Sequence, residues 1–199
     1  MKIILIYTPR CGSTSILKYF EKLKPEYKCY NEPWFDWMVD NVHKSKIDYS
    51  NIASQEDVFV KSALKTLSVP IETIVNDFDK VIFLLRKNKK EQVESSILAH
   101  NESSFTNYKK RKYNISSITN EELELIGDRY DYLNNTLTQW SIDFSKPLFY
   151  YEDLYYGSFD ALFNELDLEY NEEVFNQFLN TSNRYRDGEI LSKDKKTLI

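Results

Sequence analysis

Residues 3–15, IILIYTPRCGSTS, place an apolar run, a turn with a single glycine and a series of hydroxyl residues in direct succession. A continuous apolar run is typical of a buried parallel strand. After the turn, apolar residues recur at helical spacing from Ile16 to Leu23, and Pro25 ends the pattern. The stretch therefore predicts a strand at 3–7, a loop and a helix at 14–23.

The same alternation continues along the chain, without a repeat, a low-complexity tract or a Pro/Gly/Ser linker. In the segment 30–57, the aromatic residues between 34 and 38 predict a short helix followed by polar loop. A single domain over 1–199 is expected, with a three-layer α/β fold in which helices flank a central, mostly parallel sheet. Ligands of such a sheet bind outside the carboxyl ends of its strands. Further strands are predicted at 58–62, 80–85 and 147–151, and further helices at 69–76, 88–100, 121–141, 159–166 and 172–179.

Composition narrows the class of protein. The chain has 199 residues, of which 42% are hydrophobic and only 4 are glycine, so it can build one sizeable core. Cys11 and Cys29 are isolated thiols, which suits a reducing compartment. With only two histidines besides, a metal site is not expected. No apolar stretch approaches the roughly 20 residues that cross a bilayer, so we expect a cytoplasmic protein without membrane insertion.

Charge is unevenly distributed. Residues 1–120 carry 19 Lys/Arg against 14 Asp/Glu, whereas residues 121–199 carry 7 against 17. A small anionic ligand on the first part is favoured over a nucleic-acid duplex, which needs a broad basic face. The run 109–112 fits a solvated loop, a nucleic-acid patch or a guide for an acidic acceptor equally well.

Three segments that follow predicted strands carry the chemistry. In the first, Thr8 to Ser15, a helix N-terminus and the Arg10 guanidinium would present donors to a phosphate. The loop is not a Walker A loop, because it has one glycine and no lysine after it. An ordinary strand-to-helix turn with Ser/Thr capping is the alternative.

The other two segments each contain a cation at a strand end. Arg86 ends the most apolar strand, and the following helix carries Ser95 and Ser96. Asn88 and Glu91 there form a capping-box pattern. The Arg86 segment fits either a phosphate site or a solvated edge. Lys61 interrupts the apolar run 58–62 and is either a snorkelling edge residue or a site cation.

Together these motifs resemble the sulfotransferases that use 3′-phosphoadenosine-5′-phosphosulfate (PAPS), closest to the trehalose-type bacterial and carbohydrate-directed branches. Residues 8–15, TPRCGSTS, are similar to their 5′-phosphosulfate loop, with Cys11 in place of the usual serine. Residues 81–95 are similar to their 3′-phosphate segment. The nine-residue separation of Arg86 and Ser95, with Gln92 three before the serine, matches the trehalose-type branch and favours Ser95 over Ser96. Two weaker matches are NEPW at 31–34 and YYEDL at 150–154.

The resemblance implies a P-loop nucleotide-kinase-like sulfotransferase fold and transfer of a sulfuryl group from PAPS to a hydroxyl acceptor. A sugar acceptor is favoured by the Glu-Pro element alone. Arg10 and Lys61 would stabilise transferring charge, and Glu32 would be the base, since Ala63 stands where the cytosolic branch has histidine. An exposed or capping role for Glu32 is equally open. The residues implied for binding PAPS are Arg10, Cys11, Gly12, Ser13, Thr14, Ser15, Arg86 and Ser95.

Two other functions remain open. A nucleotide kinase on the same kind of sheet would need magnesium-dependent ATP turnover, and a non-catalytic nucleotide- or partner-binding domain would keep the sheet without the activity. The acceptor is not readable from the sequence, and no nucleic-acid partner is expected. Because the chain is short for this family, an open pocket and a pocket completed by a second subunit both fit.

Overall fold

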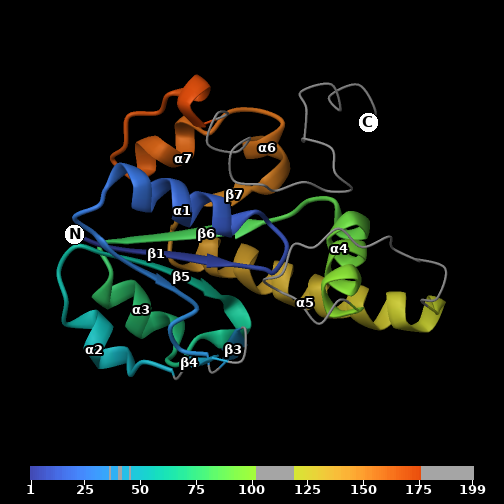
Figure 1. The fold of residues 1–199 in the computed structure, drawn as a ribbon. Helices are drawn as coiled ribbons and strands as arrows, with labels where there is room; N and C mark the ends of the chain where they lie inside the picture. Colours follow the sequence, from blue (N-terminus) through green and yellow to red (C-terminus); the bar gives the residue numbers. More distant parts are fainter. Residues whose placement is uncertain (36, 40–41, 45, 102–118, 176–199) are drawn as a thin grey trace.

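The computed structural model describes residues 1–35, 37–39, 42–44, 46–101 and 119–175. Within these ranges the chain is an α/β protein with one five-stranded, all-parallel sheet, in the order β2-β5-β1-β6-β7 (Figure 1). The strands are β1 Lys2–Tyr7, β2 Lys28–Asn31, β5 Val58–Ala63, β6 Lys80–Leu85 and β7 Leu148–Tyr150. The apolar runs predicted at 3–7, 58–62 and 80–85 therefore form the three central strands.

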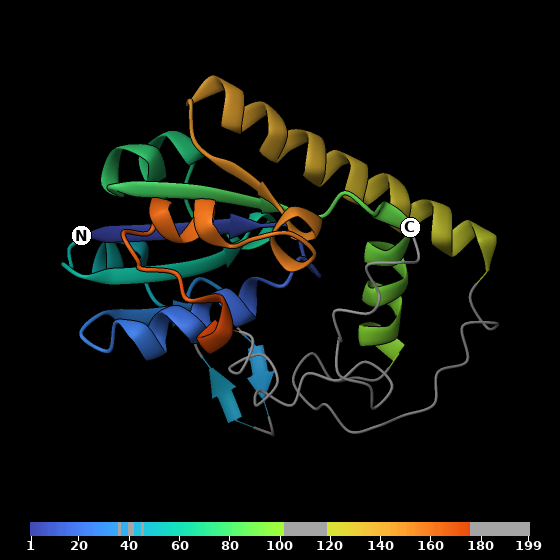
Figure 2. The same ribbon diagram turned by 90° about the horizontal axis from the view of Figure 1, so that it is seen from above.

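Helices lie on both faces of the sheet and at its carboxyl edge (Figures 1 and 2). One face is covered by α1, α6 and α7, and the other by α2, α3 and α5. Helix α4 packs against α5 beside the strand ends. The helices are α1 Ser13–Leu23, α2 Tyr49–Ala53, α3 Ile71–Asp77, α4 Lys89–Asn101, α5 Asn120–Asp143, α6 Tyr151–Tyr155 and α7 Asp160–Glu165, with a 3₁₀ turn η1 at Leu64–Thr66.

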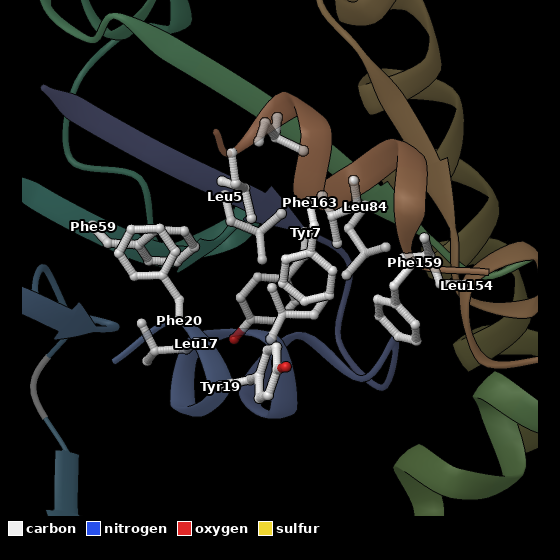
Figure 3. Packing of buried hydrophobic residues seen from close by; sticks show 14 of the residues in the cluster. Leu5, Tyr7, Leu17, Tyr19, Phe20, Phe59, Leu84, Leu154, Phe159 and Phe163 are labelled. Atoms are coloured by element: carbon white, nitrogen blue, oxygen red, sulfur yellow. The ribbon is translucent and has the colours of Figure 1, made fainter. Parts of the chain in front are cut away.

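Alternate residues of the central strands enter two separate cores, because successive side chains of a strand point to opposite faces. On β1, Leu5 and Tyr7 face α1, whereas Ile4 and Ile6 face α3. Figure 3 shows the α1 side, where rings from α1, β5 and α7 surround the β1 side chains. These two cores fix the register of β1 against β5, in which Leu5 pairs with Lys61.

The segment 30–57 differs from the prediction. It contains no helix at 34–38; instead β3 Trp37–Val39 and β4 Val42–Lys44 form a separate antiparallel pair, preceded by the unpredicted edge strand β2. The aromatic cluster misled the prediction, because Trp34 is buried against the α2–α3 side of the sheet from an irregular segment. A four-residue edge strand with a single buried residue carries no clear period.

The predicted helices at 69–76, 88–100 and 121–141 correspond to α3, α4 and α5 within a few residues. The short α6 was not predicted, because it follows β7 without a turn. The end of the helix predicted at 172–179 lies outside the described residues. None of the helices described combines the length and apolar character that spanning a membrane requires.

Candidate functional site

The loop between β1 and α1 leaves the helix N-terminus available to an anion. Arg10 and Gly12 both adopt left-handed backbone conformations, with φ of 69° and 79°, and α1 begins directly after them. Gly12 is the N-cap and supplies no side-chain capping bond. The first amides of a helix lack intrahelical partners, and the helix dipole makes this end positive. The arrangement is one that binds phosphate-like groups.

Tyr155 of α6 covers Gly12 closely. Its hydroxyl donates to the Gly12 carbonyl oxygen at 2.8 Å, and a Cβ on Gly12 would lie 2.5 Å from a ring carbon of Tyr155. Glycine is therefore required here both by backbone conformation and by the ring above it. No sequence pattern pointed to Tyr155, because it lies on a helix and is separated from Gly12 by 143 residues.

Lys61 reaches the opening of α1 from the neighbouring strand. It lies on the same side of β5 as Phe59 and Ala63, which is the α1 side. Its Nζ donates to Thr14 Oγ1 at 3.0 Å and stands 4.8 Å from the centre of the Tyr7 ring. With 3% of its surface exposed, Lys61 is buried, so the interpretation as a snorkelling edge residue is wrong.

The contact between Lys61 and Thr14 lies between two neighbouring strands whose following helices cover opposite faces of the sheet. β1 and β5 are neighbours, yet the helix after β1 covers one face and the helix after β5 covers the other. In open α/β sheets a crevice forms at such a reversal, and ligands bind there. The sheet thus places the β1 loop and Lys61 at the expected ligand-binding edge.

Arg10 and Ser95 meet across the same edge. Arg10 Nε donates to Ser95 Oγ at 2.8 Å, and Ser95 is buried. One residue further along α4, Ser96 interacts instead with the Tyr130 hydroxyl of α5. Helix α4 is fastened to the β1 loop a second time, because Gln92 Nε2 donates to Thr8 Oγ1 and to the Pro9 carbonyl oxygen. The two motifs predicted separately therefore form one cluster, and Ser95 is the serine that faces it.

Arg86 is buried among protein groups at the end of β6. Its guanidinium contacts the Glu91 carboxylate, donates from Nη1 to the Arg10 carbonyl oxygen at 3.3 Å, and lies over the Tyr151 ring at 4.5 Å. Its Nε is 3.6 Å from Glu152 Oε1 and has no hydrogen-bond partner. The solvated-edge interpretation is wrong, and the charge of Arg86 is already compensated by two carboxylates.

Glu152 and Asn88 organise the start of α4. The Glu152 carboxylate accepts from the backbone amides of Lys87 and Asn88 at 2.8 and 2.9 Å. Asn88 Oδ1 in turn accepts from the Glu91 amide at 3.1 Å, so Asn88 caps the helix as predicted. The reciprocal half of the capping box is not formed, because Asn88 donates its amide to Glu152 and Glu91 turns to Arg86.

Glu32 follows β2 and is held at three points. Its carboxylate accepts from the Tyr7 hydroxyl, from the Ala63 amide at 3.1 Å and from Thr66 Oγ1 at 2.8 Å. Glu32 itself has a left-handed backbone, with φ of 50°. The exposed interpretation is wrong: Glu32 joins β1, β5 and η1 at the site edge.

The Cys11 side chain points away from the loop into the core on the α1 side. Burial raises the pKa of its thiol to about 12, so the thiol is protonated at neutral pH. Any contact of Cys11 with an anion therefore comes from its backbone. Ser13 and Ser15 are also buried, at the start of α1.

Two further cations near this edge were missed by the sequence analysis. Lys65 lies on η1 and Arg129 on α5, and their proximity contributes to lowering the pKa of Lys65, after burial. Their separation of 64 residues gave no signal in the sequence. The basic run 109–112 lies outside the described residues.

In comparisons with known proteins, no family model and no curated protein matched this chain.

Proposed function

We propose that the chain is a sulfotransferase of the P-loop nucleotide-kinase-like type, which uses PAPS as sulfuryl donor. The observation that carries the proposal is that two cations lie beside the start of α1: Lys61 bonds to Thr14 of this helix, and Arg10, two residues before its N-cap, bonds to Ser95 of α4. The buried Lys61 and the half-buried Arg10, beside the positive end of α1, suit the phosphosulfate group of PAPS, which carries two negative charges.

Each part of the cluster has a role in this proposal. The amides from Gly12 to Ser15 would hold the 5′-phosphate, while Arg10 and Lys61 would stabilise the charge that develops on the bridging and equatorial oxygens. Ser95 and Arg86 would hold the 3′-phosphate. The donor supplies an activated sulfuryl group: the acceptor oxygen forms a bond to sulfur as the sulfur–oxygen bond to the 5′-phosphate breaks.

The acceptor proton must leave during this transfer, and Glu32 would be the carboxylate that takes it. Its oxygens already accept three hydrogen bonds. To act as the base, Glu32 must exchange one of these donors for the acceptor hydroxyl. Thr66 is the easiest to exchange, because its hydroxyl also contacts the Ala63 carbonyl oxygen and Ser62.

Calorimetric titration with adenosine 3′,5′-bisphosphate (PAP), the desulfated product, and with AMP tests the nucleotide assignment. PAP should bind at least about tenfold more tightly, since a phosphate bound by an arginine contributes about 1.5–3 kcal/mol. Equal affinities would overturn the proposal. Affinity for neither nucleotide would favour a partner-binding domain, and magnesium-dependent phosphoryl transfer from ATP would favour a kinase.

The Lys61→Met variant tests the transfer step. Methionine fills the same buried space but cannot stabilise charge. Transfer of labelled sulfuryl from PAPS should slow about 100-fold, whereas PAP affinity should change little because the product lacks the sulfuryl group. The matched control is Lys18→Met, since Lys18 is exposed on α1. Unchanged transfer in the Lys61 variant would exclude the proposed role.

A further inference from the structure

Two carbonyl oxygens of the loop between β1 and α1 are held by uncharged side chains of other elements. The Pro9 carbonyl oxygen accepts from Gln92 Nε2 of α4 at 2.8 Å. The Gly12 carbonyl oxygen accepts from the Tyr155 hydroxyl of α6, also at 2.8 Å. These donors are 83 and 143 residues away along the chain. The path of the loop is therefore fixed by α4 and α6 as well as by its own sequence.

The Gln92 side chain is itself held in one orientation. It has no exposed surface, and its Nε2 donates to Thr8 Oγ1 at 3.0 Å as well as to Pro9. Its Oε1 accepts from Asn134 Nδ2 of α5 at 3.4 Å. Since the Pro9 carbonyl oxygen can only accept, it determines which end of the Gln92 amide faces the loop. A buried polar side chain with all these partners is rigid.

The Tyr155 ring is fixed by the rings around it. It stacks on Tyr151 with the ring centroids 4.4 Å apart, and it packs at a steep angle against Phe159 at 5.0 Å. The same ring lies so close to Gly12 that an added Cβ would be 2.5 Å from one of its carbons. The hydroxyl that bonds to the Gly12 carbonyl oxygen therefore comes from a ring that cannot turn away without losing these contacts.

The loop needs such support. Arg10 and Gly12 both have left-handed backbone conformations, with φ of 69° and 79°, and residues other than glycine keep this conformation only where the surrounding structure holds them. The Arg10 carbonyl oxygen is held as well, by Arg86 Nη1 at 3.3 Å. A carbonyl oxygen is partially negative, so one that turned towards an anion at the start of α1 would repel it. Oxygens already bonded to α4 and α6 are kept from turning, and the loop is shaped before an anion binds.

We propose that Gln92 and Tyr155 are positioning residues of the anion site. They hold the Pro9 and Gly12 carbonyl oxygens away from the bound 5′-phosphate, and they thereby set the affinity for it although neither carries a charge. That the anion is the 5′-phosphate of a nucleotide rests on the proposed function. The cations of the site attract the anion directly, whereas Gln92 and Tyr155 act only through the shape of the backbone.

The Tyr155→Phe variant tests one of the two bonds. Phenylalanine keeps the ring over Gly12 and the stack on Tyr151 but lacks the hydroxyl group. In calorimetry, the affinities for inorganic pyrophosphate and for AMP should fall about fivefold. The affinity for adenosine 3′-phosphate, which has no 5′-phosphate, should be unchanged. Tyr156→Phe is the matched control, because it removes a hydroxyl group from the next residue, whose ring also packs against Tyr151, and it should change none of these affinities.

The Gln92→Met variant tests the other bond. Methionine adapts to the same buried space but donates to neither Thr8 nor Pro9. Because two buried acceptors lose their donor, the fold will be less stable, and binding is measured well below the unfolding temperature. The affinities for pyrophosphate and AMP should again fall about fivefold, while the preference for PAP over AMP stays as in wild type.

A purely structural role would give a different result, because a loosened edge of the sheet would weaken binding of both phosphates. An equal loss of affinity for AMP and for adenosine 3′-phosphate in Tyr155→Phe would therefore overturn the inference. So would unchanged affinities for pyrophosphate and AMP in both variants, or a loss of the PAP preference in Gln92→Met.

Pyrophosphate separates this inference from the proposed function. If wild type binds pyrophosphate and both variants bind it more weakly, the two residues position the loop whichever nucleotide the protein uses. If wild type then shows no preference for PAP over AMP, the proposed function fails and the positioning role stands. If wild type binds none of pyrophosphate, AMP and PAP, the loop is not an anion site, and the inference and the proposed function both fail.

Discussion

Arg10 and Ser95 are joined by a hydrogen bond of 2.8 Å from Nε to Oγ, although 85 residues separate them. The bond links the loop after β1 to the middle of α4, and both partners sit where the ends of the parallel strands meet. It also fixes the direction of the Arg10 guanidinium. Because the guanidinium group is planar and rigid, the positions of its other two nitrogens are restricted as well.

Replacing Ser95 should weaken PAP binding. In Ser95→Ala, Arg10 loses the acceptor that orients it, and the proposed 3′-phosphate loses a hydroxyl donor. We expect PAP affinity to fall about tenfold, measured by calorimetry. Ser96→Ala is the control from the next position of the same helix, since Ser96 faces Tyr130. Equal effects of the two changes would contradict the assignment of Ser95.

Glu91 should compete with a phosphate for Arg86. Its carboxylate contacts the Arg86 guanidinium, and its side chain is 37% exposed, so it can move outward. In Glu91→Gln the competing charge is removed. The backbone amide of residue 91 still donates to Asn88 Oδ1, so Asn88 still caps α4. PAP affinity should rise several-fold, by about 1 kcal/mol. Glu94→Gln, three residues along α4, should have no such effect.

A decrease in PAP affinity for Glu91→Gln would show that Glu91 positions Arg86 for the ligand instead of competing with it. The Arg86→Ala variant gives a poorer test of the phosphate role. It removes a buried guanidinium and leaves the half-buried Glu152 carboxylate without the cation 3.6 Å away, and loss of one partner of a fully buried pair costs about 3–5 kcal/mol. Any loss of nucleotide binding would then be mixed with unfolding.

Gly12 should tolerate no side chain. In Gly12→Ala, a left-handed alanine costs about 1–2 kcal/mol, and Tyr155 must also move away from the new Cβ. We expect the free energy of unfolding in urea to fall by at least about 2 kcal/mol. In Gly12→Ala/Tyr155→Ala the clash disappears, while the backbone strain and the lost packing of Tyr155 remain, so the effects of the two changes should be less than additive.

Gly127→Ala serves as the comparison within a helix. A Cβ at Gly127 would meet only the Lys89 side chain, at 3.7 Å. Since alanine favours a helix over glycine by about 1 kcal/mol, this variant should be more stable than wild type. Destabilisation of equal size at both positions would refute the specific role of Gly12.

The Cys11 thiol should be unreactive in the folded protein. Its burial should also make the folded protein less stable at alkaline pH. Burial raises the pKa of Cys11 from 9.0 to about 12, so the unfolded chain loses this proton at lower pH. The stabilisation is complete below pH 9.0 and is lost as the pH rises towards about 12. In a Cys29→Ala background, a thiol reagent near pH 8 should react only after denaturation. Fast reaction of the native protein would contradict burial.

The sequence predicts the three central strands well because their runs are buried on both faces and so carry a strong, uninterrupted signal. It also points to the loop at 8–15 and to Arg86, since each directly follows such a strand, and to Lys61, since a lysine interrupts the apolar run of β5. Edge strand β2 is missed because only Tyr30 of its four residues is buried. Tyr155, Lys65 and Arg129 are missed for another reason: each reaches the site through packing of elements distant in sequence.

Glu32 illustrates what a sequence motif leaves undecided. The Glu-Pro pattern is compatible with a base, a cap or an exposed carboxylate. Only the fold shows that β1, β5 and η1 each send a donor to it. A carboxylate with three protein donors is a structural junction, and that role would exist whether or not it also takes a proton.

Glu32→Gln and Thr66→Ala together separate these two roles. Glutamine cannot accept hydrogen bonds at both ends of the side chain, so Glu32→Gln leaves one donor facing an NH₂ group and should destabilise the fold by about 1–3 kcal/mol. Thr66→Ala removes one of the three bonds and should cost about 1 kcal/mol, without touching the carboxylate. If Glu32 is the base, sulfuryl transfer measured well below the unfolding temperature should be largely lost in Glu32→Gln and retained in Thr66→Ala. Parallel losses of transfer in both variants would assign Glu32 to the junction alone.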